Sequence, residues 1–466
     1  MEENQKKELF TSVPVPRALA TLAVPTIISQ MINLIYNMVD AFFIGRTGNS
    51  YMMAATTVTL TLTLLNVAFS NLYGVGGGSL IARLMGQNRL DEARRVSAFS
   101  VYASLGLALS YSLLMGLFME PVLRFLGASD ATIGYACQYT RFVIVIGTVP
   151  ALLSMTLAHL LRNAGYSSQA SLGLSGGGIL NMVLDPLFMF VLLPPGNEVV
   201  GAALATLISN VTAFLYLTYA FRKACAAAPL SLRWRDAMAV ERHNVARLFS
   251  VGVPSAILTG LFDLASICVN ILSAAHSDLV LAGMGIVLKV ERVPNAVNIG
   301  ICQGMLPLVA YNFASGDHRR MKETIRFGRL CGLSISAVSI LLLELFAYPA
   351  THLFLSTSSG NAEAAVRTVA YAAVFLRIRC VASPVQFLNY HTSYCMQAMG
   401  RGRETMLHSV VRELVFYIPF MFLLDRLFGE LGLASALPVG EGCGALFALF
   451  LLRRVLRRHS NQEERR

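Results

Sequence analysis

The residues best suited to chemistry lie in the stretch 181–186, which reads NMVLDP, inside an apolar run that extends from 172 to 193. A carboxylate in such a run must be paired, hydrated or neutralised, because a bare charge in hydrocarbon is costly. Asn181 and Asp185 are four residues apart and share one face of a helix. Pro186 cannot donate a backbone hydrogen bond and frees a carbonyl group one turn earlier. We therefore predict a helix face that binds a small cation.

The helices that position this face are predicted to cross a membrane. The chain has 466 residues, of which 55% are hydrophobic and only 14% are charged, whereas soluble domains carry about 25% charge. Apolar runs near the length of a membrane span recur about twelve times. They cover roughly 17–44, 52–77, 96–118, 134–161, 170–193, 199–221, 248–273, 279–305, 328–354, 366–396, 407–427 and 431–452. The predicted fold class is an all-α integral membrane protein with about twelve transmembrane helices.

The distribution of charge predicts the orientation of these helices. The net charge of +11 comes largely from Lys and Arg that gather in alternate loops and at both termini, while the other loops are short and poor in them. This asymmetry is a topology signal, so it does not indicate a nucleic-acid partner. It predicts a multi-pass protein of the plasma membrane, which is the inner membrane of the cell. Both termini are predicted to lie in the cytoplasm.

The sequence also repeats itself. Residues 76–82 and 304–310 are similar and end the second and eighth predicted spans, and residues 23–25 and 252–254 open the first and seventh. The two halves therefore contain six helices each. An even number of helices per half makes the halves parallel and pseudo-symmetric, and the natural binding site lies between them.

The repeat also predicts the division of the chain. The N-lobe covers residues 1–222, a basic cytoplasmic linker covers 223–247, and the C-lobe with a basic tail covers 248–466.

Several features together resemble a known family. Pro25 precedes Asp40 by fifteen residues in the first helix, Asn181 and Asp185 lie in the fifth, and 201–206 (GAALAT) lies in the sixth. With the two six-helix halves, this pattern resembles the multidrug and toxic compound extrusion (MATE) transporters over essentially the whole chain.

The resemblance implies an antiporter that exports small organic cations or drugs in exchange for protons or sodium ions, by alternating access. It implies that Asp40, Asn181, Asp185 and Thr206 form the N-lobe cation site, with the first helix bending at Pro25. The expected partners are the substrate and membrane lipids, with no nucleic acid. The expected working form is a monomer without a cofactor other than the coupling ion.

The depth of the four residues in their helices agrees with this site. At 1.5 Å per residue, Asp40 lies about 34 Å along the first helix, Asp185 about 24 Å along the fifth, and Thr206 about 10 Å down the sixth. All of them fall in the outer half of the membrane. Their oxygens suit a sodium ion, and two crowded carboxylates can share a proton. Both coupling ions remain open.

The second half is less regular. Apolar residues near Val269 and Ile418 occupy the repeat positions of Asp40 and Asp185, so the N-lobe site is not duplicated. A second-lobe polar site is instead expected among Asp263, Lys289, Glu291 and Arg292. One interpretation is that Glu291 pairs with a neighbouring arginine or lysine and is neutralised. The other is a second cation-sensitive site or a counter-charge for substrate.

Three other functions compete with the antiporter. A lipid or lipid-linked oligosaccharide flippase would favour a cationic cavity, which Lys289, Arg292, Arg377 and Arg379 could supply. An enzyme is not expected, because we find no His/Glu metal spacing, no Ser-His-Asp set and no nucleotide loop. The glycine-rich stretch 74–79 lacks the Lys-Ser/Thr ending of a phosphate loop and predicts close helix packing. A scaffold or channel would not explain the buried polar set.

Overall fold

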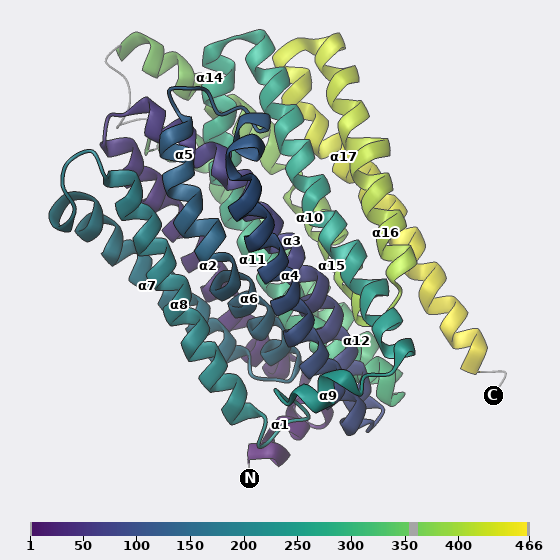
Figure 1. Ribbon diagram of the computed structural model, residues 1–466. Coiled ribbons are helices and arrows are strands. Elements are labelled where there is room, and N and C mark those ends of the chain that lie inside the picture. The colour runs from purple at the N-terminus through teal and green to yellow at the C-terminus, as the bar shows by residue number, and fades with distance from the viewer. Residues whose placement is uncertain (1, 354–361, 464–466) are drawn as a thin grey trace.

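The computed structural model describes residues 2–353 and 362–463, and the predicted tail residues 464–466 lie outside this part. The first half of the chain forms helices that turn back and forth through one bundle (Figure 1). These elements are α1 (Glu2–Thr11), α2 (Val15–Arg46), α3 (Ser50–Gly86), α4 (Leu90–Phe125), α5 (Ile133–Thr140), the π-helical η1 (Arg141–Ile146), α6 (Thr148–Asn163), α7 (Ser167–Leu187), the π-helical η2 (Phe188–Leu192) and α8 (Glu198–Ala224).

The second half repeats this arrangement beside the first. Its elements are α9 (Trp234–Met238), α10 (Arg242–His276), α11 (Asp278–Ser315), α12 (His318–Leu345), α13 (Ala347–Leu353), α14 (Ala362–Cys380), α15 (Ser383–Ala398), α16 (Gly402–Val410), the π-helical η3 (Val411–Tyr417) and α17 (Ile418–Glu463). Figure 1 shows both chain ends towards the same end of the bundle, which we call the basal end.

The number of membrane passes agrees with the sequence. Within the described residues, nine helices are long and apolar enough to cross a membrane, and two further passes are helix pairs bent by 47° and 50°. The helix from Gly402 to Arg457 contains two passes, because it breaks at Gly429, where φ is 61°. Glycine tolerates this left-handed backbone, which strains other residues. The predicted all-α fold with twelve transmembrane helices in two lobes is confirmed.

The repeated glycines bring the lobes together. A Cβ atom on Gly76 of α3 would stand 2.6 Å from the Leu248 carbonyl oxygen of α10, and one on Gly304 of α11 would stand 2.5 Å from the Ala23 Cα atom of α2. No larger residue fits without moving a backbone. Within the N-lobe, Gly74 lies similarly close to the ring of His159. The predicted role of the glycine-rich stretch in close packing is therefore confirmed.

The basal end is also held by the first helix. The Phe10 ring stacks on Tyr311 of α11, with 5.0 Å between ring centroids. Arg320 of α12 donates from Nε to the Phe10 carbonyl oxygen at 2.8 Å and from Nη2 to that of Leu9 at 3.2 Å. A cation at the C-terminal end of a helix binds carbonyl groups that have no partner inside the helix. α1 thereby joins the N-terminus to the C-lobe.

Candidate functional site

The N-lobe polar cluster, consisting of Asp40, Asn181, Asp185 and Thr206, centres on one face of α7. The Asn181 side-chain amide donates to Asp185 Oδ1 at 3.2 Å and to the Thr206 hydroxyl of α8 at 3.4 Å. Asp185 is 0% exposed and Asn181 is 2% exposed. The helical spacing of four residues thus produces the shared face that the sequence predicts.

Glycines on α7 let its neighbours approach this face. A Cβ atom on Gly178 would stand 3.2 Å from Tyr36 Cδ1 of α2, and one on Gly177 would stand 3.0 Å from the Ala213 Cβ atom of α8. α7 therefore packs closely against α2 on one side and α8 on the other. The two neighbouring helices are the ones that carry Asp40 and Thr206, so the small residues assemble the cluster.

Asp40 completes the cluster from α2. Its carboxylate interacts electrostatically with that of Asp185, and its Oδ1 atom is buried without a hydrogen-bond partner. Two tyrosines that sequence reasoning missed join it, because Tyr36 and Tyr139 both interact with the two carboxylates. Tyr36 lies one helical turn before Asp40, a spacing that could have revealed it. Tyr139 carries no such signal.

The donor set fits a small cation or a proton. Three oxygens of the cluster are buried without a hydrogen-bond partner, namely Asp40 Oδ1, Asn181 Oδ1 and Asp185 Oδ2. Buried oxygens usually find a partner, so their concentration at one place needs an explanation. Carboxylate, amide and hydroxyl oxygens are hard ligands that suit sodium. Two close carboxyl groups can also hold one proton between them.

The helix changes character just beyond Asp185. Pro186 lies inside α7, and the chain continues directly into the π-helical segment η2. A proline leaves a carbonyl group of the preceding turn without its donor, and π-helical turns are frequent at functional sites. A Cβ atom on Gly201 of α8 would stand 2.9 Å from the Met189 Cα atom of η2, so α8 packs directly against this segment.

The predicted bend at Pro25 is not a break in this structure. α2 is continuous from Val15 to Arg46 and includes Pro25 in its interior. Thr26 donates its hydroxyl proton to the Leu22 carbonyl oxygen at 2.8 Å, a local bond that often accompanies a deformable turn. The role of Pro25 as the bending point stays a prediction.

The predicted second-lobe residues are distributed over two places. Glu291 of α11 forms a two-fold ion pair with Arg379 of α14, at 2.7 Å from Nε and 2.9 Å from Nη2. Lys289 and Arg292 are exposed. Half-buried Asp263 of α10 interacts with Arg292 rather than with Glu291. Glu291 is therefore paired with an arginine, but with one from a different helix.

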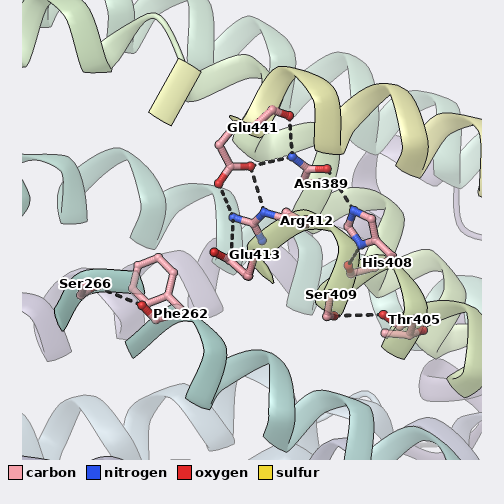
Figure 2. Close-up of polar contacts among 10 residues, drawn as sticks. Phe262, Ser266, Asn389, Thr405, His408, Ser409, Arg412, Glu413 and Glu441 are labelled. Carbon is pink, nitrogen blue, oxygen red and sulfur yellow. Dashed lines mark hydrogen bonds and ion pairs between the residues drawn. The ribbon is translucent and has the colours of Figure 1, made fainter. Parts of the chain in front are cut away.

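The C-lobe also contains a buried ionic cluster that sequence reasoning missed. Arg412 and Glu413 of η3 meet Glu441 of α17, and Asn389 and His408 extend the contact (Figure 2). The side chains of Arg412, Glu413 and Glu441 are 1% exposed. The adjacent Arg-Glu pair inside the apolar run 407–427 was the available signal, because charges in such a run are functional candidates.

Two six-pass lobes that enclose charged side chains define a polytopic membrane protein of the two-lobed transporter class. The family model described as MatE matches residues 25–187 and 254–423, one segment in each lobe. The chain therefore belongs to the multidrug and toxic compound extrusion (MATE) family of transporters.

Similar proteins agree with this assignment. The chain is 27% identical to the multidrug export protein MepA of Staphylococcus saprophyticus and 28% identical to that of Staphylococcus haemolyticus, each over 443 residues, with 95% of this chain and 94% of the relative covered. A solved structure described as the outward-facing conformation of a multidrug resistance MATE family transporter matches with a TM-score of 0.90 at 21% identity. That match covers 98% of both chains, and at this identity it shows the fold alone.

Proposed function

We propose that the protein exports small organic cations or drugs across the plasma membrane in exchange for protons or sodium ions. Both termini lie in the cytoplasm, the coupling ion is the only cofactor, and the monomer is the working form. The observation that carries the proposal is the set of buried, unpartnered oxygens in the N-lobe polar cluster. The multidrug export relatives support the substrate class.

The packing of α2 supplies a route from the ion to the lobe interface. Asp40 lies on the same helix as Ala23 and Ile27, which contact Gly304 and Gly300 of α11. Pro25 stands between these two contact residues. Ion uptake at Asp40 would change the charge at one end of α2, and a bend at Pro25 would change the lobe contact at the other end.

We assign this structure to the outward-facing state. The lobe contacts of Gly76, Gly86, Gly300 and Gly304 lie in the basal halves of α3 and α11. The hydrogen bond from Asn71 to Thr259, at 3.0 Å, lies farther from the basal end than these glycine contacts. Lobes that close at the basal end would let substrate and ion exchange at the other side, which is one half of an alternating-access cycle.

The flippase alternative is less well supported by the charges of the C-lobe. A pyrophosphate group would need arginines that are free to bind it. Arg379 is already paired with Glu291, and Arg377 lies 3.8 Å from Glu344. Two of the four cations expected to recognise an anionic headgroup are thus neutralised by acids of the same lobe.

Efflux of a cationic dye from proteoliposomes tests the proposal. A sodium gradient and a proton gradient are imposed separately, and dye release is followed by fluorescence. We expect one of the two gradients to drive release. If neither does and the same vesicles move a fluorescent lipid between leaflets, the antiporter proposal is wrong and the flippase replaces it.

A further inference from the structure

The buried ionic cluster of the C-lobe contains one fully paired acid. Glu441 accepts a hydrogen bond from Arg412 Nε at 2.9 Å, a second from Arg412 Nη2 at 2.5 Å and a third from the Asn389 amide at 2.6 Å. The Tyr390 ring covers the guanidinium group, with its centroid 5.0 Å from Arg412 Cζ. All these partners are donors, so Glu441 is an ionised carboxylate with its counter-charge in place.

The surrounding hydrogen bonds are also fixed in direction. Because Asn389 donates its amide protons to Glu441, its side-chain oxygen must accept from His408 Nε2, at 3.0 Å. His408 then carries its proton on Nε2, and its Nδ1 atom accepts from the Ser393 hydroxyl at 2.9 Å. A neutral His408 ring satisfies both contacts, and its Nε2 proton is donated to Asn389.

Glu413 has no comparable partners. Both of its carboxyl oxygens are buried without a hydrogen bond, and the nearest cation is Arg412 Nη2 at 3.6 Å. Arg412 supplies one positive charge, and Glu413 and Glu441 together supply two acids. With both acids ionised, the cluster would bury a net negative charge, which is costly in a low-dielectric core. Since Glu441 holds the donors, Glu413 is the member that carries a proton.

Tyr417 of η3 interacts with Glu413 and also with Arg379 and Glu291, whose charges compensate each other in their own ion pair. The other elements packed against η3 add no compensating charge among the described residues. α10 presents Phe262 and Ser266 on the side that Glu413 faces (Figure 2), and its Asp263 interacts with Arg292. α16 contributes neutral His408, and α17 contributes Glu441. Arg412 and Glu441 are the charged groups that act on Glu413.

We infer that Glu413 is a proton-binding site of the C-lobe, with the Arg412–Glu441 ion pair as its fixed counter-charge. When the neutral carboxyl group releases its proton to water, the new carboxylate lies one short movement from Arg412. Glu413 lies in η3, and π-helical turns are frequent at functional sites. The inference rests on the proposed antiport, since it adds a proton-coupling step in the C-lobe to the ion site of the N-lobe.

The internal repeat supports this location. The fifth pass of each lobe contains both a buried acid and a π-helical segment. Asp185 lies shortly before η2, and Glu413 lies inside η3. Glu413 is not at the repeat position of Asp185, which lies near Ile418. The second lobe therefore has an ionisable site on the corresponding helix, displaced along it towards the basal end.

Infrared spectroscopy tests the site without depending on transport. The carbonyl stretch of protonated carboxyl groups is recorded during a pH titration of the purified protein, with Asp40→Asn and Asp185→Asn present to silence the N-lobe. We expect the difference between the spectra with and without Glu413→Gln to contain one titrating band that moves in D2O. Glu413→Asp, which keeps the carboxyl group, should shift this band. A titration without any such band, or a band unchanged in both variants, would overturn the inference.

The transport assay separates this inference from the proposed function. In proteoliposomes with native Asp40 and Asp185, Glu413→Gln should abolish the response of dye efflux to a proton gradient. Glu120→Gln, at an acid whose side chain is 58% exposed, is the matched control and should keep it. If the wild-type protein exports no dye but the band is lost in Glu413→Gln, the antiport fails and the proton site stands. If efflux in Glu413→Gln equals that of wild type, the coupling role is wrong.

Discussion

Gly76 of the N-lobe and Gly252 of the C-lobe face each other across the lobe interface, where a Cβ atom on Gly76 would stand 3.0 Å from the Gly252 Cα atom. The pseudo-symmetric counterpart is the contact of Gly304 with Ala23. Both contacts use the residues through which the sequence repeats itself. The repeat is therefore preserved at the surface where the two lobes meet and must separate.

Two glycine-to-alanine substitutions in α11 should separate the effect of the lobe contact on stability from the effect of helix propensity. Gly304→Ala places a methyl group against the α2 backbone and is expected to destabilise the protein by about 1–3 kcal/mol. Gly285→Ala, on the same helix with nothing within 4 Å of its Cβ position, should be neutral or stabilising by up to about 1 kcal/mol. Thermal unfolding of both purified variants in detergent measures the difference. Equal shifts would show that Gly304 is not a packing contact.

The N-lobe polar cluster should be essential for efflux but not for folding. Asp40→Asn and Asp185→Asn each keep the size and hydrogen-bonding capacity of the side chain but remove the titrating charge. We expect each variant to be inserted and monodisperse, with dye efflux close to that of empty vesicles. Asp130→Asn changes an acid whose side chain is 92% exposed and should transport normally. Wild-type efflux in both cluster variants would contradict the site.

Pro25 and its repeat counterpart Pro254 provide a matched pair. Pro25→Ala restores a helical hydrogen bond in α2 and should reduce the helix's ability to bend, because proline is a common cause of kinks. We expect dye efflux to slow while the unfolding temperature is maintained or rises. Pro254→Ala makes the same change in α10, which carries no part of the N-lobe cluster, and should have the smaller effect on efflux. A larger effect of Pro254→Ala than of Pro25→Ala on efflux would locate the bend in the C-lobe.

Glu291 and Arg379 should each be needed for stability only while the other is present. Glu291→Gln leaves a buried guanidinium without its counter-charge and is expected to cost about 3–5 kcal/mol in stability. Replacing both residues with leucine removes both charges, and its stability should lie much closer to that of the wild type. A double-mutant cycle on thermal unfolding measures the coupling. If the double leucine variant is as unstable as Glu291→Gln, the unpaired charge of Arg379 is not the cause of the lost stability.

The two glutamates near Arg412 should differ in their effect on stability. Glu441→Gln removes the ionised partner of a buried arginine, and a loss of about 3–5 kcal/mol is expected. Glu413→Gln replaces a neutral acid that makes no hydrogen bond with a neutral amide, and it should change stability by less than about 1 kcal/mol. Thermal unfolding of the two variants side by side provides the comparison. A larger loss of stability in Glu413→Gln would indicate that Glu413 is the ionised acid and that Glu441 carries the proton.

Much of the fold could be predicted because hydrocarbon imposes simple rules on sequence. Spans must be long and apolar, and basic loops report their orientation. Asn181 and Asp185 could be found for the same reason, since polar residues stand out in an apolar run and local helix geometry places them on one face. The repeated glycines could be recognised as packing residues. Their partners across the lobe interface could not be identified from their spacing.

The partners of buried charges were decided by the tertiary structure. The sequence determined that Glu291 needed a counter-charge, but Lys289 and Arg292 were nearer along the chain than Arg379, which the fold brings against it from another helix. Tyr139 reaches the N-lobe cluster, and Glu441 reaches Arg412, in the same way. A helix presents its side chains to whichever neighbour packs there, and sequence separation carries no information about that neighbour. The sequence by itself therefore determined the membrane fold, the two lobes and the acid on α7. Packing decided which charges form hydrogen-bonded ion pairs and which buried acid makes no hydrogen bond.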